Sequence, residues 1–385
     1  MAKQKLKIKV NKSPGDFGIL ITTLLLSVIG IVMVYSSSYY KALSESGNPN
    51  SYLRNNLIWM AIGWVVFAVF ATVDYHFWSR FAVLAMGVAF VTMLLIYTPK
   101  SWGIAKTINN ATRWIKIPPG SGGGITFMPG EIAKVALILF VAWFYASDPQ
   151  RIHRFFRGHL IMLAIAGAAF VLIYKQPNLS TAGIVLILAL GMMLIAGLHW
   201  GWVLGGIGAG ALGFAGLVAL KGGYWLKRVT SFWDPFQDYL GDGYQVSQSL
   251  MAFGSGGVFG VGLGKSMQKA LYLPECWSDF ILPIIGEELG FVGAALIILL
   301  FALLVWRGVV IGVNADSRYG ALVAMGIVFQ LAVQVILNIA VATDSIPNTG
   351  ISLPFFSYGR TSMIMNMAAM GFVLSISRSA RIKRR

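Results

Sequence analysis

Long apolar runs recur along nearly the whole chain and constrain its fold more than any other feature of the sequence. A helix that spans a bilayer needs about 20 mostly apolar residues. The 385 residues are 57% hydrophobic and only 11% charged, whereas a soluble domain carries about a quarter charged residues. We therefore expect an all-α polytopic membrane protein with about ten transmembrane helices, forming one integral membrane domain over 1–385. The expected spans are near 17–38, 55–73, 79–98, 129–146, 158–175, 180–198, 201–219, 287–307, 320–342 and 359–377.

Positive charge is concentrated at the two ends of the chain rather than in one stripe. The net charge is +16, and the basic tails are residues 1–16 and 378–385. Short basic segments beside membrane spans stay on the cytoplasmic side, so both termini are expected in the cytoplasm. This distribution disfavours nucleic acid as a partner. The single cysteine, Cys276, excludes an intrachain disulfide, and the first apolar run is longer than the core of a signal peptide.

This topology places four connecting segments on the outer face, at about 99–128, 175–180, 220–286 and 343–358. The segment 220–286, between the seventh and eighth expected spans, is much longer than ordinary connections. Its many aromatic residues argue against disorder, so we expect a large structured extracellular loop. Six glycines from Gly254 to Gly264 predict a re-entrant or tightly packed element within it.

Four acidic residues lie within fourteen positions, from Glu275 to Glu288, although the whole chain has only fourteen. Apolar residues surround Asp279, and a carboxylate in such surroundings tends to have a raised pKa. That environment is typical of a general base or a metal ligand. Asp279 is therefore the candidate catalytic residue, and Asp279 and Glu288 are candidate ligands of Mg²⁺ or Mn²⁺, with no organic cofactor expected. Alternatively, Glu287 and Glu288 only favour the positive end of the following helix.

A second group of charges comprises Arg113, Glu131 and Lys134, around the start of the fourth expected span. Pro129 suits the first turn of a helix, and Glu131 and Lys134 share a helix face because they are three residues apart. The helix would begin at the outer surface, with its positive end there. Arg113, Lys134 and this helix end are candidates for holding a pyrophosphate. The alternative is a Glu131–Lys134 ion pair that only locks helices together.

Several short motifs occur in one order across nearly the whole chain. Each motif alone is weak, but the ordered set resembles the shape, elongation, division and sporulation (SEDS) family, which includes FtsW, RodA and SpoVE. The run Leu273–Gly290 is more similar to the FtsW and SpoVE branch than to RodA. The motifs are Tyr35–Ser38, Ala111–Ile115, Pro129–Lys134, Gly243–Gln245, Gln248–Ala252, Gly262–Gly264, Gln268–Lys269, Leu273–Glu275, Ser278–Phe280, Gly286–Gly290, Leu353–Pro354 and Ser357–Gly359.

The resemblance implies a peptidoglycan glycosyltransferase that joins lipid II units into glycan strands for cell division or elongation. It would release undecaprenyl pyrophosphate at the outer face of the bacterial cytoplasmic membrane. A class B penicillin-binding protein would supply transpeptidation, alongside other divisome or elongasome proteins. Asp279 corresponds to the family's essential aspartate. The candidates for binding substrate lie in matching motifs and are Arg113, Glu131, Lys134, Lys269, Glu275 and Ser357.

The expected reaction and its alternatives follow from where charge lies. A sugar hydroxyl attacks an anomeric carbon as the pyrophosphate leaves, so a base and nearby positive charge are needed. Inversion at that carbon requires only one carboxylate, which we assign to Asp279. The alternatives are a lipid II flippase and an unrelated transporter, and the latter is disfavoured because two related halves are not evident. A flippase needs polar groups along the whole path, whereas the expected charges cluster in the outer half of the spans.

Overall fold

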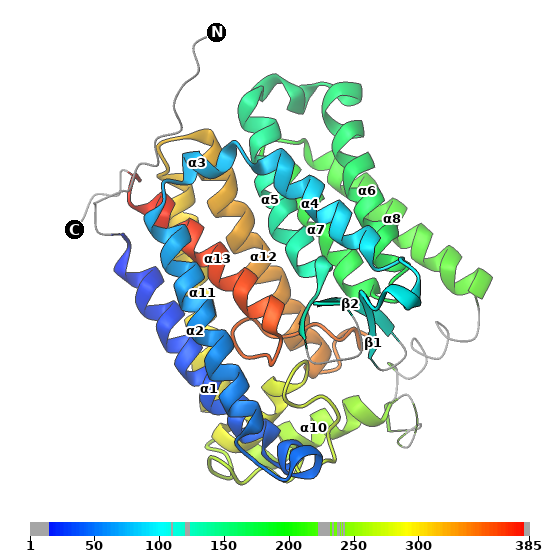
Figure 1. Ribbon diagram of the computed structural model, residues 1–385, viewed down its shortest axis with the longest axis vertical. Coiled ribbons are helices and arrows are strands. Elements are labelled where there is room, and N and C mark those ends of the chain that lie inside the picture. The colour runs from blue at the N-terminus through cyan, green and yellow to red at the C-terminus, as the bar shows by residue number, and fades with distance from the viewer. Residues whose placement is uncertain are drawn as a thin grey trace.

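Helices fill most of the structure, a computed structural model that describes residues 15–380 apart from 109–110, 120–123, 222–231, 233–234, 237–238, 240 and 242. Within this part of the chain, a helix occupies each range expected to be a span (Figure 1). Six helical segments are long and apolar enough to cross a membrane, and α4 and α7 are shorter apolar helices. The polytopic, mainly helical architecture is therefore confirmed. The long helices are α1 (Phe17–Ser46), α2 (Ser51–Thr72), α4 (Ala82–Leu95), α5 (Pro129–Ser147), α6 (Leu160–Tyr174), α7 (Leu179–Ile195), α8 (Trp200–Lys221), α11 (Ile281–Val313), α12 (Arg318–Ala342) and α13 (Arg360–Ser377).

Helix α5 lies inside the bundle and packs against α4, α7 and α12. Most of its side chains are buried, including Leu137 and Tyr145, because the helix is apolar around its whole circumference. By contrast, α2 and α11 expose large apolar side chains such as Val65, Phe291 and Leu299. An apolar periphery around a packed interior is what a bilayer permits and water does not.

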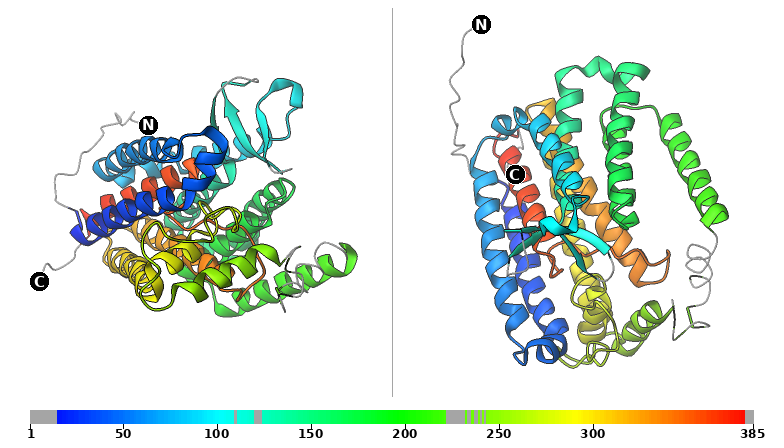
Figure 2. Two further views of the ribbon diagram at one scale, coloured as in Figure 1. Left: turned by 90° about the horizontal axis from the view of Figure 1, so that it is seen from below. Right: turned by 45° about the vertical axis from the view of Figure 1, so that its right-hand side comes forward.

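The bundle has two unlike ends, which we call the terminal end and the loop end. At the terminal end, the Asp16 N–H donates to Ser377 Oγ (3.0 Å) and Ser375 Oγ donates to the Val73 carbonyl (2.8 Å). The loop end carries the strands and α10 (Tyr244–Gly256), which lies across the bundle when seen from below (Figure 2). The remaining short elements are α3 (Tyr75–Ser79), the 3₁₀ turns η1 (Lys100–Trp102) and η2 (Pro149–His153), and the π-helical η3 (Phe155–His159). Of the expected basic tails, residues 1–14 and 381–385 lie outside the described part of the chain.

A small antiparallel sheet occupies the first outer segment, which the sequence analysis treated only as a connection rich in glycine and proline. Its strands are β1 (Ala105–Ile108), β2 (Ala111–Ile117) and β3 (Ile125–Phe127), in the order β1-β2-β3. Ile115 in β2 pairs with Ala105 on one side and Phe127 on the other. Threonine, tryptophan and isoleucine in β2 favour a strand. The sheet positions Arg113, in the middle strand, at the loop end.

The glycine-rich segment after α10 packs tightly against a kink in α11. Helix α11 begins at Ile281, earlier than expected, and is interrupted at Gly290, where φ is 69° and ψ is −171°. The Val261 and Gly262 N–H groups donate to the carbonyls of Glu287 (2.9 Å) and Glu288 (3.0 Å). These bonds satisfy carbonyls that the kink releases from the helix. The prediction of a tightly packed element over 254–264 is confirmed.

Gly290→Ala is expected to destabilise the folded protein by about 2 kcal/mol or more, because a Cβ at this position would collide with the backbone of Gly260 while φ is positive. The melting temperature of the detergent-solubilised protein, followed by size-exclusion chromatography, measures the effect. The control is Gly87→Ala in α4, where a Cβ meets nothing within 4 Å and alanine favours the helix. Equal melting temperatures for the two variants would contradict a close backbone approach at Gly290.

Candidate functional site

Asp279 lies in the turn that leads into α11, and hydrogen bonds hold both its backbone and its side chain. Asn338 Nδ2, from inside α12, donates to the Asp279 carbonyl (2.9 Å) and to the Ile351 carbonyl (2.7 Å). Ser278 Oγ donates to Asp279 Oδ1 (3.0 Å) and lies 3.2 Å from Ser357 Oγ. Asn338 of α12 therefore holds the backbone of the turn, whereas Ser278, which lies beside Ser357 in the segment before α13, holds the half-buried carboxylate.

The electrostatic surroundings of Asp279 include one cation and one anion from the region of β2 and α5. Burial raises the pKa of Asp279 above its ordinary value, the Ser278 hydrogen bond and the charge of Arg113 lower it in part, and the Glu131 charge raises it. Contacts connect these groups through the start of α7. Arg113 donates to the Pro177 carbonyl, and a Cβ at Gly130 would contact Thr181. Ser180 donates to the carbonyl of Thr349, next to Gly350, which borders the Asp279 carboxylate. The structure thus brings together the two groups of charges that the sequence analysis identified separately.

Glu131 and Lys134 form a buried ion pair in the first turns of α5. Lys134 Nζ lies 2.8 Å from Glu131 Oε1, and their side chains are 1% and 9% exposed. The other carboxylate oxygen of Glu131, Oε2, is buried and has no hydrogen-bond partner among the described residues. Burying an acceptor without a donor is unfavourable, so this oxygen is available to a donor group of a ligand. The ion pair predicted as the alternative role is present, and the unpaired oxygen leaves a binding role open to test.

The other side of the site is formed by the start of α7 and the segment after α12. A Cβ at Gly130 would lie 2.9 Å from Thr181 Cγ2, so α5 and α7 begin close together. Ser180 Oγ donates to the carbonyl of Thr349. At the next residue, Gly350, φ is 62° and a Cβ would lie 3.2 Å from Asp279 Oδ2. Glycine here permits the turn and leaves space beside the carboxylate.

The arrangement therefore combines a positioned carboxylate, a nearby guanidinium and the positive ends of two helices. Arg113 also donates to the Pro177 carbonyl just before α7, which orients it between β2 and α7. Helix N-termini attract phosphate and other anions. Chemically, this arrangement suits proton removal at Asp279 beside a group that leaves with negative charge.

Comparison with known proteins identifies the family. The family model described as "Cell cycle protein" (FTSW_RODA_SPOVE) matches residues 17–382. The chain belongs to the FtsW, RodA and SpoVE family. Stage V sporulation protein E of Bacillus subtilis is 40% identical over 371 residues, covering 96% of this chain and 99% of the relative. A Geobacter sp. (strain M18) relative named probable peptidoglycan glycosyltransferase FtsW is 36% identical over 374 residues, covering 95% of this chain and 97% of the relative.

Solved structures share the fold. A structure described as showing "structural coordination of polymerization and crosslinking by a peptidoglycan synthase complex" matches with a TM-score of 0.77 at 23% identity, covering 94% of this chain and 98% of that one. Thermus thermophilus RodA matches with a TM-score of 0.66 at 22% identity, covering 96% of this chain and 98% of that one. Together with the family match, these likenesses confirm the SEDS family and its fold, as the ordered motifs predicted.

Lys269, predicted to bind substrate, and Glu288, predicted to bind a metal, form an ion pair with each other in this FtsW, RodA and SpoVE family member. Lys269 Nζ donates to Glu288 Oε1 (2.7 Å) and to Ser36 Oγ (2.9 Å), and all three side chains are buried. This cluster joins α1, α11 and the turn before α11, so it favours a packing role for Lys269 and Glu288. Among the described residues no group of three His, Cys, Asp or Glu side chains could hold a metal ion.

Glu287 and Glu275 also have roles in the local fold. Glu287 accepts hydrogen bonds from Ser266 Oγ and from the Met267 N–H (2.8 Å). Neither Glu287 nor Glu288 lies in the first turn of α11, so the expectation that they favour the helix end is wrong. Glu275 has a positive φ of 53°, and its carbonyl accepts from the Asp279 N–H (3.1 Å). Glu275 therefore shapes the turn that presents Asp279.

The sequence analysis missed three contributors to the site, namely Asn338, Ser180 and the Thr349–Gly350 turn. Asn338 carried a usable signal, since a polar side chain inside an apolar span is usually buried against a partner. Ser180 and Gly350 carried none, because serine and glycine are common at helix starts and turns.

Proposed function

We propose that this family member is a peptidoglycan glycosyltransferase that polymerises lipid II into glycan strands for cell division or elongation. One observation carries the proposal: the Asp279 carboxylate is held by hydrogen bonds beside Arg113 and the starts of α5 and α7. The named activity of the Geobacter relative, which aligns over 95% of this chain, supports the same reaction.

Reaction would begin when Asp279 takes the proton of the acceptor sugar hydroxyl. The hydroxyl oxygen then bonds to the anomeric carbon of the donor, whose bond to the pyrophosphate oxygen breaks with inversion. Undecaprenyl pyrophosphate leaves with the bonding electron pair, and Arg113 and the two helix ends stabilise its negative charge. The Ser278 hydrogen bond fixes Asp279 Oδ1, which leaves Oδ2 to take the proton.

A divalent cation fits this site only together with the substrate. Mg²⁺ is commonly held by one or two carboxylates plus substrate phosphates, and Asp279 is the predicted metal ligand that remains at this site. Asp279 and the substrate pyrophosphate would hold Mg²⁺ or Mn²⁺, which would supply further positive charge for the leaving group.

The proposed location is the bacterial cytoplasmic membrane, with the terminal end in the cytoplasm and the reaction at the loop end outside. Both ends of the chain carry basic tails, residues 1–16 and 378–385, and such tails favour the cytoplasmic side. The start of α1 and the end of α13 meet at the terminal end, which supports this orientation. We further propose a class B penicillin-binding protein as partner, together with other divisome or elongasome proteins, because a structural neighbour is described as a peptidoglycan synthase complex.

Polymerisation of purified lipid II separates this proposal from the lipid II flippase. The chain and its transpeptidase partner, reconstituted in vesicles with fluorescent lipid II, are expected to form a ladder of glycan strands on gels. Lipid II accessibility on each leaflet is measured in the same vesicles. Transfer of lipid II between leaflets without any glycan would instead assign the flippase function.

Polymerase activity is expected to fall as pH decreases from neutral, with a midpoint above the ordinary range for an aspartate. The reason is that burial raises the pKa of Asp279, and only the ionised carboxylate accepts a proton. The rate of glycan formation against pH, at saturating lipid II, measures this limb. A rate that stays constant down to the ordinary pKa range of aspartate would argue against Asp279 as the base.

A further inference from the structure

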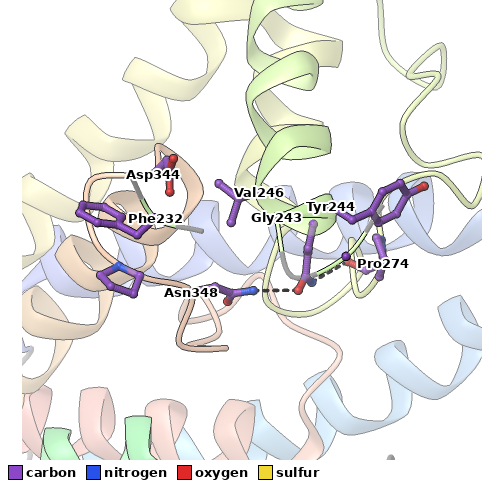
Figure 3. Close-up of a pocket in the computed structure, with 10 residues that line it drawn as sticks. Phe232, Gly243, Tyr244, Val246, Pro274, Asp344 and Asn348 are labelled. Carbon is purple, nitrogen blue, oxygen red and sulfur yellow. Dashed lines mark hydrogen bonds between the residues drawn. The ribbon is translucent and has the colours of Figure 1, made fainter. Parts of the chain in front are cut away.

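A polar cavity opens at the loop end, between α10 and the segment after α12, and none of the steps above uses it. Its volume is about 310 Å³. Asp344 and Phe232 lie on one side, Tyr244 and Pro274 on the other, and Asn348 between them (Figure 3). Among the described residues that line it, none is a lysine, arginine or histidine.

Asp344 is the charged group of this cavity. It is half-buried, and its carboxylate makes no hydrogen bond or ion pair with any described residue. Burial raises the pKa of Asp344 to about 6, so the group is mostly ionised at neutral pH. Asp344 has a positive φ of 55°, and its N–H donates to the Val341 carbonyl (3.2 Å) at the end of α12. With no lysine, arginine or histidine among the described residues that line the cavity, this half-buried carboxylate gains from a cation that binds beside it.

The rest of the cavity provides a fixed polar wall and an aromatic face. Asn348 Nδ2 donates to Gln245 Oε1 (2.9 Å), and Gln245 Nε2 donates to the Pro274 carbonyl (3.0 Å). These bonds connect the segment after α12 to α10 and to the turn before α11. The Phe232 ring, beside Asp344 in Figure 3, suits an ammonium group, since cations are attracted to aromatic faces.

The cavity adjoins the proposed reaction site through one short segment. Asn348 lines the cavity, Thr349 accepts from Ser180, and Gly350 borders the Asp279 carboxylate. A ligand whose sugar lies at Asp279 can therefore extend a substituent across Thr349–Gly350 toward Asp344.

We propose that this cavity binds lipid II through Asp344. The bound group is the primary ammonium group of the peptide that is attached to the sugar of lipid II. The proposal rests on the proposed polymerase function, and it identifies a specificity site for the peptide part of lipid II. A single carboxylate beside amide oxygens and an aromatic ring matches a monovalent ammonium better than a divalent metal, which needs more oxygen ligands.

The test compares two forms of fluorescent lipid II that differ only at a lysine of the stem peptide, one with a free amine and one with the amine acetylated. Wild type is expected to have a KM about fivefold to tenfold lower for the free amine. Asp344→Asn should lose this preference and leave the rate with acetylated lipid II unchanged. Asparagine suits the variant because it tolerates a positive φ and removes only the charge.

The preference is a ratio within one preparation, so a smaller folded fraction does not change it. Asp316→Asn, which removes an aspartate charge near the terminal end, is the control and should keep the preference. A wild type that uses both substrates with the same KM, or an Asp344→Asn variant that keeps the preference, would overturn the proposal while the polymerase function stands. If wild type polymerises neither substrate, the polymerase function fails, and the ammonium site fails with it.

Discussion

Asp279→Asn is expected to lower the rate of glycan formation by a factor of about 10²–10⁴, the range that a positioned general base contributes. Asparagine keeps the size of the side chain and can still accept the Ser278 hydrogen bond, but its amide cannot take up the proton of a sugar hydroxyl. The fold should persist, because Asn338 holds the turn through the Asp279 carbonyl rather than the carboxylate. Initial rates with fluorescent lipid II, at equal amounts of folded protein, measure the loss.

Two comparisons make this loss specific to Asp279. Asp316→Asn should keep the wild-type rate, because it removes the same kind of charge near the opposite end of the bundle. Ser278→Ala should lower the rate less than Asp279→Asn, because it loosens the carboxylate without removing it. Wild-type rates in Asp279→Asn would exclude Asp279 as the base, and equal losses in Asp316→Asn would show that the assay reports a general effect of charge.

Much of the fold could be predicted because a bilayer demands long apolar helices, and these are visible in sequence. The prediction was weakest where residues pack against protein rather than lipid. Helix α11 begins at Ile281 rather than near 287, because its first turns are buried against the glycine-rich segment. The sheet over 105–127 was missed because its short strands lie among glycines and prolines that are typical of a connection.

The sequence predicted the two groups of residues in the candidate site, but it did not predict that these groups lie close together in the fold. Spacing alone predicted the Glu131–Lys134 contact, since three residues make less than one helical turn. That Asp279 meets Arg113 depends on how α5, α7 and α12 pack, and periodicity does not specify packing. Lys269 was predicted to bind substrate but pairs with Glu288. A lysine close to an acidic run has the same sequence pattern in both cases, so the sequence could not distinguish them.

Removing one partner of the Glu131–Lys134 pair is expected to destabilise the protein by about 3–5 kcal/mol, because the remaining charge stays buried without compensation. Lys134→Met therefore should lower the melting temperature of the solubilised protein markedly. The control is Lys41→Met in α1, which breaks the ion pair between Lys41 and Glu45. The Lys41 side chain is 31% exposed and the Glu45 side chain is 48% exposed. Exposed pairs contribute about 1 kcal/mol or less, so the control should melt close to wild type.

The double variant Glu131→Gln with Lys134→Met then separates a packing role from a binding role. It removes both charges, so most of the stability lost in Lys134→Met should return. If the pair only holds helices together, polymerase activity returns with stability. We expect instead a stable protein whose polymerase activity is at least about tenfold below that of wild type. The reason is that the variant lacks the buried carboxylate oxygen Glu131 Oε2, which has no hydrogen-bond partner among the described residues and could bind a donor group of the substrate. Full activity in the stable double variant would restrict Glu131 and Lys134 to packing and leave Arg113 and the helix ends to hold the pyrophosphate.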